Sequence, residues 1–112
     1  MRSLLIAICI FSFLAGPALA LPFYVGSWVQ DPVACTLPDP MLEFSEATFF
    51  GYEDTCELTN PVNIRGMEAV LFDAVCHGEG GEDTHRMLIT AEDDTRIMLH
   101  HYGRTTILEA CE

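Results

Sequence analysis

The residues best suited to chemistry in this chain lie in residues 77–85, which read His-Gly-Glu-Gly-Gly-Glu-Asp-Thr-His. Two imidazoles and three carboxylates within nine residues offer ligands that Zn²⁺ or a similar ion accepts. The spacing matches neither H-E-x-x-H nor the acidic positions of an EF-hand loop. The segment therefore predicts either a metal site formed by His77, Glu79, Glu82 and His85 or an ordinary acidic turn. We expect no cofactor other than this Zn²⁺.

Other catalytic signals are weak. His100 and His101 are adjacent, so on a strand they point to opposite faces and at most one can join such a site. Ser27 and Ser45 are the only serines after residue 20, and neither lies in a G-x-S-x-G elbow. The chain also has no phosphate-binding loop and no dinucleotide fingerprint. We therefore expect a protein that is not an enzyme.

The first 20 residues have the three parts of a secretory signal peptide. Arg2 is the charged start, residues 4–14 are apolar or small, and Ala18-Leu19-Ala20 is an A-x-A cleavage site. Cleavage there leaves residues 21–112, which are few enough for a single small β-rich domain. We expect export to the bacterial periplasm or the outside of the cell, with no membrane span after cleavage.

Four cysteines lie in residues 21–112, at positions 35, 56, 76 and 111. In a small domain that folds in an oxidising compartment, four cysteines indicate two disulfides, and sequence alone allows three pairings. Keeping each bridge within one half of the chain predicts Cys35–Cys56 and Cys76–Cys111.

The elements that would position these side chains are strands. Alternating apolar residues mark residues 68–76, and the alternation resumes over 86–92 and 97–102, with a glycine-rich acidic loop predicted at 78–83. Asp31 followed by Pro32 predicts one helical turn. The sequence therefore predicts an all-β fold, an antiparallel meander of six to eight short strands. Hiding the sheet edges requires closure, or near closure, into a barrel or sandwich.

The net charge limits the classes of partner that the protein can bind. Residues 21–112 carry 17 carboxylates, four arginines and no lysine, a formal net charge of −13. Such a surface repels nucleic acid and anionic membranes. It suits a basic protein or a cation, or it serves solubility alone.

Two resemblances bear on the fold and the location. Gly26-Ser27-Trp28 resembles the G-x-W signature that opens the first strand of lipocalins; alternatively, Trp28 only fills the bottom of a small core. The chain after residue 20 is also similar to small exported proteins of unknown function from alphaproteobacteria such as rhizobia. Its matching motifs are Gly26-x-Trp28, Asp31-Pro32-x-x-Cys35, Phe44-Ser45, Cys56, Cys76-x-Gly78-Glu79-Gly80 and Cys111. This resemblance implies a periplasmic location and two disulfides, and it provides no catalytic residues.

Three interpretations of function remain open. The first is a binding or interaction module, similar in kind to an inhibitor, whose acidic surface faces a basic protein. The second is a metal-binding protein that uses residues 77–85, and the third is a small hydrolase.

Overall fold

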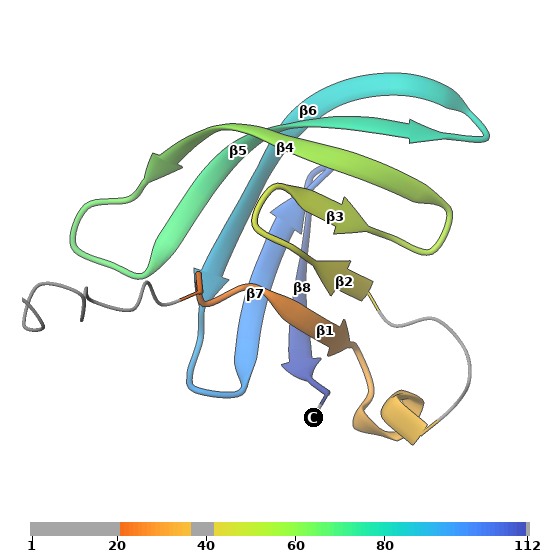
Figure 1. Cartoon of the computed structure of the whole chain (residues 1–112). Coiled ribbons are helices and arrows are strands. Elements are labelled where there is room, and N and C mark those ends of the chain that lie inside the picture. Colours follow the sequence, from red (N-terminus) through yellow and green to blue (C-terminus); the bar gives the residue numbers. More distant parts are fainter. Residues whose placement is uncertain (1–20, 37–41, 112) are drawn as a thin grey trace, which may run out of the picture.

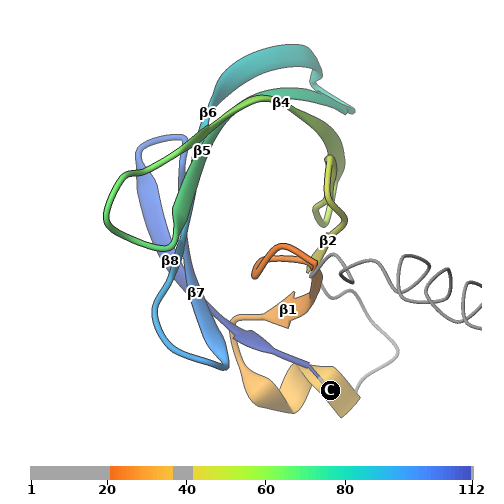
Figure 2. The same cartoon turned by 60° about the vertical axis from the view of Figure 1, so that its left-hand side comes forward.

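The described part of the chain, residues 21–36 and 42–111 of a computed structural model, forms a closed antiparallel barrel (Figure 1). The predicted signal peptide, residues 1–20, lies outside the described residues. Each strand pairs with the next along the chain, and β8 pairs with β1, so that the sheet curves round on itself (Figure 2). The predicted all-β antiparallel fold is thus confirmed, as a barrel. The strands found among the described residues are β1 (Gly26–Val29), β2 (Leu42–Phe44), β3 (Thr48–Phe50), β4 (Asp54–Asn63), β5 (Ala69–Gly78), β6 (Gly81–Ala91), β7 (Arg96–His101) and β8 (Arg104–Ala110).

Three of the strands are longer than the short strands predicted, since β4, β5 and β6 have 10, 10 and 11 residues. The loop predicted at residues 78–83 is mostly strand, because β5 runs to Gly78, β6 starts at Gly81, and those two residues pair. Gly81 has a φ of 103°, which favours glycine. β4 also continues through Pro61, because a bulge after Thr59 lets the pairing resume at Val62.

Alternation along the strands sends one set of side chains to the barrel interior. Strands β1 to β8 all contribute to one buried apolar core. Its fully enclosed members include Phe44, Met87, Ile89, Ile97 and Leu108. The barrel interior is therefore filled by its own side chains over much of its length.

One end of the barrel is closed by aromatic residues at the start of the described chain. The ring of Tyr24 packs against Phe44 and Phe72, with centroids 5.8 and 5.7 Å apart, and its hydroxyl donates a 2.7 Å hydrogen bond to the carbonyl of Glu46. Trp28 is 5% exposed, and its Nε1 donates to the carbonyl of Tyr24 at 2.8 Å. Burial, and then the charge of Glu46, raise the pKa of Tyr24. Trp28 therefore fills the core, and we call this region the closed end.

Two disulfides are present, Cys35–Cys111 and Cys56–Cys76, so the predicted pairing of Cys35–Cys56 and Cys76–Cys111 is wrong. Closure of the barrel explains the first bridge. β8 lies beside β1, and the backbone N–H of Cys111 donates a 2.9 Å hydrogen bond to the backbone carbonyl of Ser27. Cys35 follows β1 directly, in the short helix η3 (Pro32–Thr36), and so reaches Cys111.

The second bridge joins residues that lie directly opposite each other on β4 and β5, where both side chains are buried. The pairing predicted from separate halves failed because the sheet closes as a single ring. Two disulfides fit a protein that folds in an oxidising compartment.

The predicted helical turn is confirmed as η3, a five-residue 3-10 helix, and the Asp31 carboxylate accepts a 3.0 Å hydrogen bond from the N–H of Val33 near its start. Within residues 21–36 and 42–111, no helix has the length and apolar character needed to cross a membrane.

Candidate functional site

The end of the barrel opposite the closed end contains a cavity of about 770 Å³. In an antiparallel meander, the connections β3–β4, β5–β6 and β7–β8 all fall at the same end, and residues of all three line this cavity. We call this end the mouth and define it by the residues that line the cavity. Its wall includes the buried apolar residues Leu42, Phe49, Leu99 and Leu108 together with Gln30 and Thr106, and its rim carries Tyr52, Glu53, Asp54, Glu79, Glu82, Asp83, His101, Tyr102 and Arg104.

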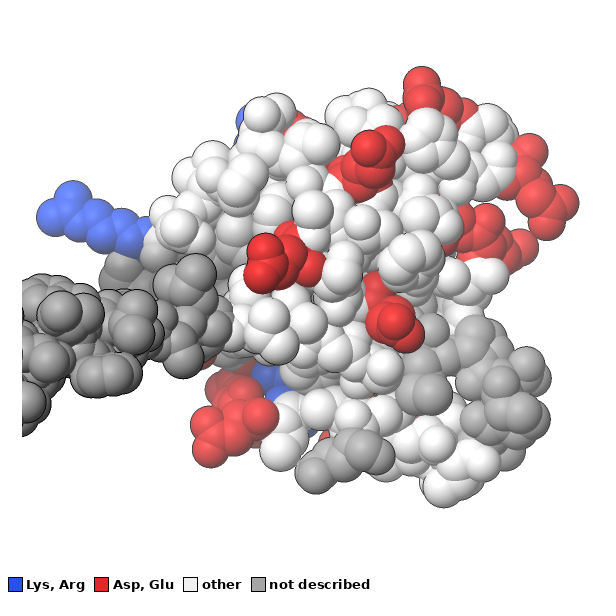
Figure 3. Space-filling view, viewed as in Figure 1, with Lys and Arg blue, Asp and Glu red and all other residues white. Residues whose placement is uncertain are grey.

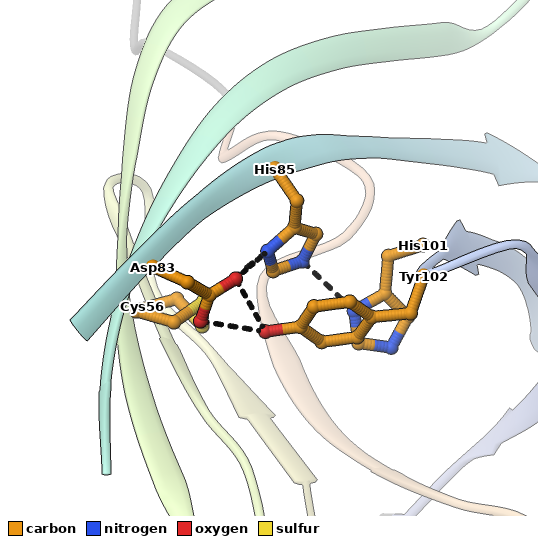
Figure 4. Close-up of polar contacts among 6 residues, drawn as sticks. Cys56, Asp83, His85, His101 and Tyr102 are labelled. Carbon is orange, nitrogen blue, oxygen red and sulfur yellow. Dashed lines mark hydrogen bonds and ion pairs between the residues drawn. A yellow bond between two sulfur atoms is a disulfide. The ribbon is translucent and has the colours of Figure 1, made fainter. Parts of the chain in front are cut away.

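Four side chains from two hairpins meet at one side of the mouth, and we call them the mouth cluster: Asp83, His85, His101 and Tyr102 (Figure 4). His85 Nδ1 lies 3.1 Å from Asp83 Oδ2, and His85 Nε2 lies 3.3 Å from His101 Nδ1. The Tyr102 hydroxyl donates to the Asp83 carboxylate, with both oxygens at 3.0 Å. Its ring stacks on His85, with centroids 3.7 Å apart and planes 27° apart. The cluster is thus a connected chain of polar contacts.

Strand alternation explains why these residues meet. Met87 on β6 faces the core, so His85 and Asp83, two and four residues earlier, lie on the same inward face. On β7, Leu99 likewise faces the core, so His101, two residues later, lies on the same inward face. Met87 is the partner of His101 in the β6–β7 register, which brings His101 close to His85. The core pattern therefore continues into the mouth with polar residues in place of apolar ones.

Tyr102 has an unusual backbone for a bulky residue. Its φ is 52°, and with Gly103 at 72° it forms the two-residue turn between β7 and β8. Left-handed backbone at a residue other than glycine, asparagine or aspartate is sparsely populated and costs roughly 1–3 kcal/mol. The stacking on His85 and the hydrogen bond to Asp83 offset this cost. Such strain clusters at functional sites, which supports the mouth cluster as the candidate site.

Burial, and then the neighbouring His85, lower the pKa of His101, although the charge of Asp54 acts in the opposite direction. Desolvation of the phenol, and then the hydrogen bond to Asp83, raise the pKa of Tyr102 to about 12. At neutral pH, Tyr102 is therefore a protonated donor and His101 is a neutral imidazole with a free lone pair.

The rim of the mouth is acidic, since five of its residues carry carboxylates, of which Glu82 turns outward to His77, and only Arg104 is basic. Figure 3 shows acidic side chains spread over the face seen in Figure 1, with several grouped at the upper right, over the end of the β5–β6 hairpin. A cation that approaches this end therefore meets a favourable potential.

The structure places the two imidazoles of the metal site predicted from residues 77–85 on opposite faces of the sheet. His77 faces outward, where Nδ1 lies 3.1 Å from Glu82 and Nε2 lies 3.4 Å from Glu57. His85 faces inward, and Glu79 lies in the turn between β5 and β6. Because the segment is a continuous hairpin and not a loop, alternation separates the two predicted imidazoles.

The prediction that His100 and His101 point to opposite faces is confirmed. His100 is exposed, with Nδ1 2.7 Å from the hydroxyl oxygen of Thr105, whereas His101 contacts His85. Sequence reasoning allowed one of this pair to join a site, but it missed Tyr102. The signal for Tyr102 was its place before Gly103, in a two-residue turn that directs a side chain back toward the mouth.

Two further groups of possible ligands include sulfur atoms: Asp54 with Cys56 and Cys76, and Cys76 with Asp83 and His85. Because Cys56 and Cys76 are joined in a disulfide, neither has a thiolate to offer a metal. Without the sulfur atoms, the first group keeps only Asp54, and the second keeps Asp83 and His85.

Comparison of the chain with known protein families, curated proteins and solved structures gives no match. The similarity to small exported alphaproteobacterial proteins therefore stays a prediction, and the function has to be argued from the mouth itself.

Proposed function

We propose that the protein is an exported binding module and that the mouth is its binding surface for a basic partner protein. The observation that carries the proposal is the cavity of about 770 Å³, which combines an apolar wall with a rim of five acidic residues and one arginine. A charge that served solubility alone would not need a hollow surface.

The mouth suits a lysine or arginine side chain of a partner. The apolar wall can cover the aliphatic part of such a side chain, while the rim carboxylates accept charge-assisted hydrogen bonds from its head. Tyr52 and Tyr102 are each 53% exposed at the rim, so their rings are accessible to a cation. Exposed tyrosines beside carboxylates are thus suited to recognise a basic side chain.

Export is part of this proposal. The A-x-A site after an apolar run supports passage into the periplasm or out of the cell, and the two disulfides agree with an oxidising destination. A partner would then be another protein of the cell envelope or an external protein.

The contacts of His85 at the mouth favour binding over hydrolysis there. In the part of the chain that the structure describes, the ring nitrogens of His85 contact Asp83, His101 and the disulfide sulfur of Cys76. None of these partners is a hydroxyl or thiol nucleophile, which is what a histidine base would have to activate in nucleophilic hydrolysis.

Two variants with equal charge changes test the proposal. The mouth variant is Glu53→Gln, Asp54→Asn and Glu79→Gln. The control is Glu68→Gln, Glu92→Gln and Asp94→Asn, which changes three carboxylates near Trp28 at the closed end. Immobilised, oxidised residues 21–112 of each form are used to capture proteins from the native envelope, and the captured proteins are quantified.

We expect the unchanged protein and the control to retain one basic protein that elutes as salt is raised, and the mouth variant to lose most of it. Equal retention by all three forms would contradict the proposal. Equal loss from both variants would show that net charge, and not the mouth, holds the partner.

A further inference from the structure

We propose that His85 and His101 form a binding site for one Zn²⁺ ion, with Asp83 as a positioning residue. The inference does not rest on a basic protein partner. It starts from the spacing of two ring nitrogens that belong to different strands, His85 Nε2 on β6 and His101 Nδ1 on β7, which lie 3.3 Å apart.

This spacing fits a shared metal ion. Zn²⁺ binds imidazole nitrogen at about 2.0–2.1 Å in tetrahedral geometry, so two nitrogens on the same ion lie about 3.3–3.4 Å apart. The same distance also suits a hydrogen bond between the two rings. The strands therefore already hold the nitrogens at the separation that zinc requires, and binding requires each ring to turn so that both lone pairs point to the ion instead of along the line between the nitrogens.

Asp83 sets the tautomer of His85. A carboxylate only accepts hydrogen bonds, so Asp83 takes the hydrogen on Nδ1 of His85 and leaves the lone pair of Nε2 directed to His101. A carboxylate on the far nitrogen of a ligating histidine is the usual support for a zinc site. Zinc replaces the hydrogen on His101 Nδ1, and this hydrogen moves to His101 Nε2, so binding at neutral pH releases no net proton.

The surroundings favour a cation and leave room for its remaining ligands. Asp54 lies close enough for its charge to act on His101, and Asp83 adds a second carboxylate. His101 lines the cavity of about 770 Å³, which has space for water molecules to complete the coordination. Tyr102 covers one face of His85 and holds Asp83, so it limits the motion of both.

The chain contains two matched controls for this site. His100 is adjacent to His101 but is exposed on the outer face, with its Nδ1 beside Thr105. His77 lies on the outer face between Glu57 and Glu82, and it belongs to the ligand set that sequence alone suggested. Substitution of either removes an imidazole without touching the mouth cluster.

The test measures Zn²⁺ binding by calorimetry on untagged, oxidised residues 21–112, since a histidine tag would itself bind the ion. We expect one Zn²⁺ per chain with a micromolar dissociation constant. His85→Gln and His101→Gln should each weaken binding at least about tenfold, and Asp83→Asn should weaken it about 10–100-fold. His100→Gln and His77→Gln should bind as the unchanged protein does.

A second measurement on the unchanged protein covers the case in which His85→Gln fails to fold. In ¹⁵N spectra of the histidine rings, Zn²⁺ should shift His85 Nε2 and His101 Nδ1, while the rings of His77 and His100 stay in place. The proposal is overturned if 100 μM Zn²⁺ produces no binding, if His101→Gln binds normally, or if binding is lost in His77→Gln.

Discussion

At the closed end, the polar atoms of Tyr24 and Trp28 bond to backbone carbonyls, whereas at the mouth the polar atoms of His85, His101 and Tyr102 bond to other side chains. A backbone partner is fixed by the fold, so Tyr24 and Trp28 add to the packing of the core and have already donated their side-chain hydrogens. Side-chain partners can be exchanged for a ligand without unfolding the sheet. The same meander thus uses aromatic residues for stability at one end and, in the function proposed here, for recognition at the other.

The largest expected effect is a difference between the two ends in how much a substitution lowers the free energy of unfolding. Trp28→Ala removes a buried indole from the closed end and should lower the free energy of unfolding by about 3–5 kcal/mol. Tyr52→Ala at the mouth removes a ring that is 53% exposed and should lower it by less than about 1 kcal/mol. Urea unfolding of oxidised protein checks both values. Similar losses from the two substitutions would remove the contrast between the ends.

The second expected effect concerns the disulfide that borders the mouth. Replacing Cys56 and Cys76 together by alanine opens a loop with a sequence separation of 20 residues, and in the chain-entropy picture this costs about 3 kcal/mol. The same change at Cys35 and Cys111, with a separation of 76, should cost about 4.5 kcal/mol. Denaturant unfolding of both double variants should therefore rank the Cys35–Cys111 bridge as the more stabilising. The reverse order would indicate that Cys56–Cys76 supports the mouth beyond its effect on the unfolded chain.

The smallest expected effect distinguishes two tyrosines whose pKa values are raised for different reasons. Burial dominates at Tyr24, whereas desolvation and the hydrogen bond to Asp83 raise the pKa of Tyr102 to about 12. Asp83→Asn should lower the pKa of Tyr102 while keeping it above 10, and it should leave that of Tyr24 unchanged. The NMR chemical shifts of the tyrosine ring carbons, measured as a function of pH, give both pKa values.

The sign of the accompanying stability effect follows from the raised pKa. The protonated phenol is favoured in the folded state, so the contribution of Tyr102 is complete below pH 10 and is lost as the pH rises toward 12. If the pKa of Tyr102 does not move in Asp83→Asn, the hydrogen bond in the mouth cluster is not formed in solution.

The sequence was most informative about local pattern and least informative about long-range closure. Alternation over residues 68–76 and 97–102 was enough to predict the strands and the opposite directions of His100 and His101. The Cys35–Cys111 bridge depends on β8 meeting β1, and no local pattern encodes that contact.

The two imidazoles of the predicted metal site lie on opposite faces of the sheet for a related reason. Glycines at positions 78, 80 and 81 were interpreted as a flexible loop, but only a two-residue turn separates β5 from β6. Because β5 reaches Gly78 and β6 starts at Gly81, His77 faces outward and His85 faces inward, so these two imidazoles lie on opposite faces of the sheet. His85 instead meets a histidine 16 residues away, on a strand whose register only the folded barrel defines.

The most direct test of the mouth as the binding end is an NMR map of where a basic probe contacts the protein. ¹⁵N-labelled, oxidised residues 21–112 are titrated with a nona-arginine peptide at physiological ionic strength, and amide shifts are compared between the ends. We expect the shifts to concentrate at Glu53, Asp54, residues 79–83 and Tyr102, and to stay small at Glu68, Glu92 and Asp94. Shifts of equal size at the acidic residues of both ends would contradict the account.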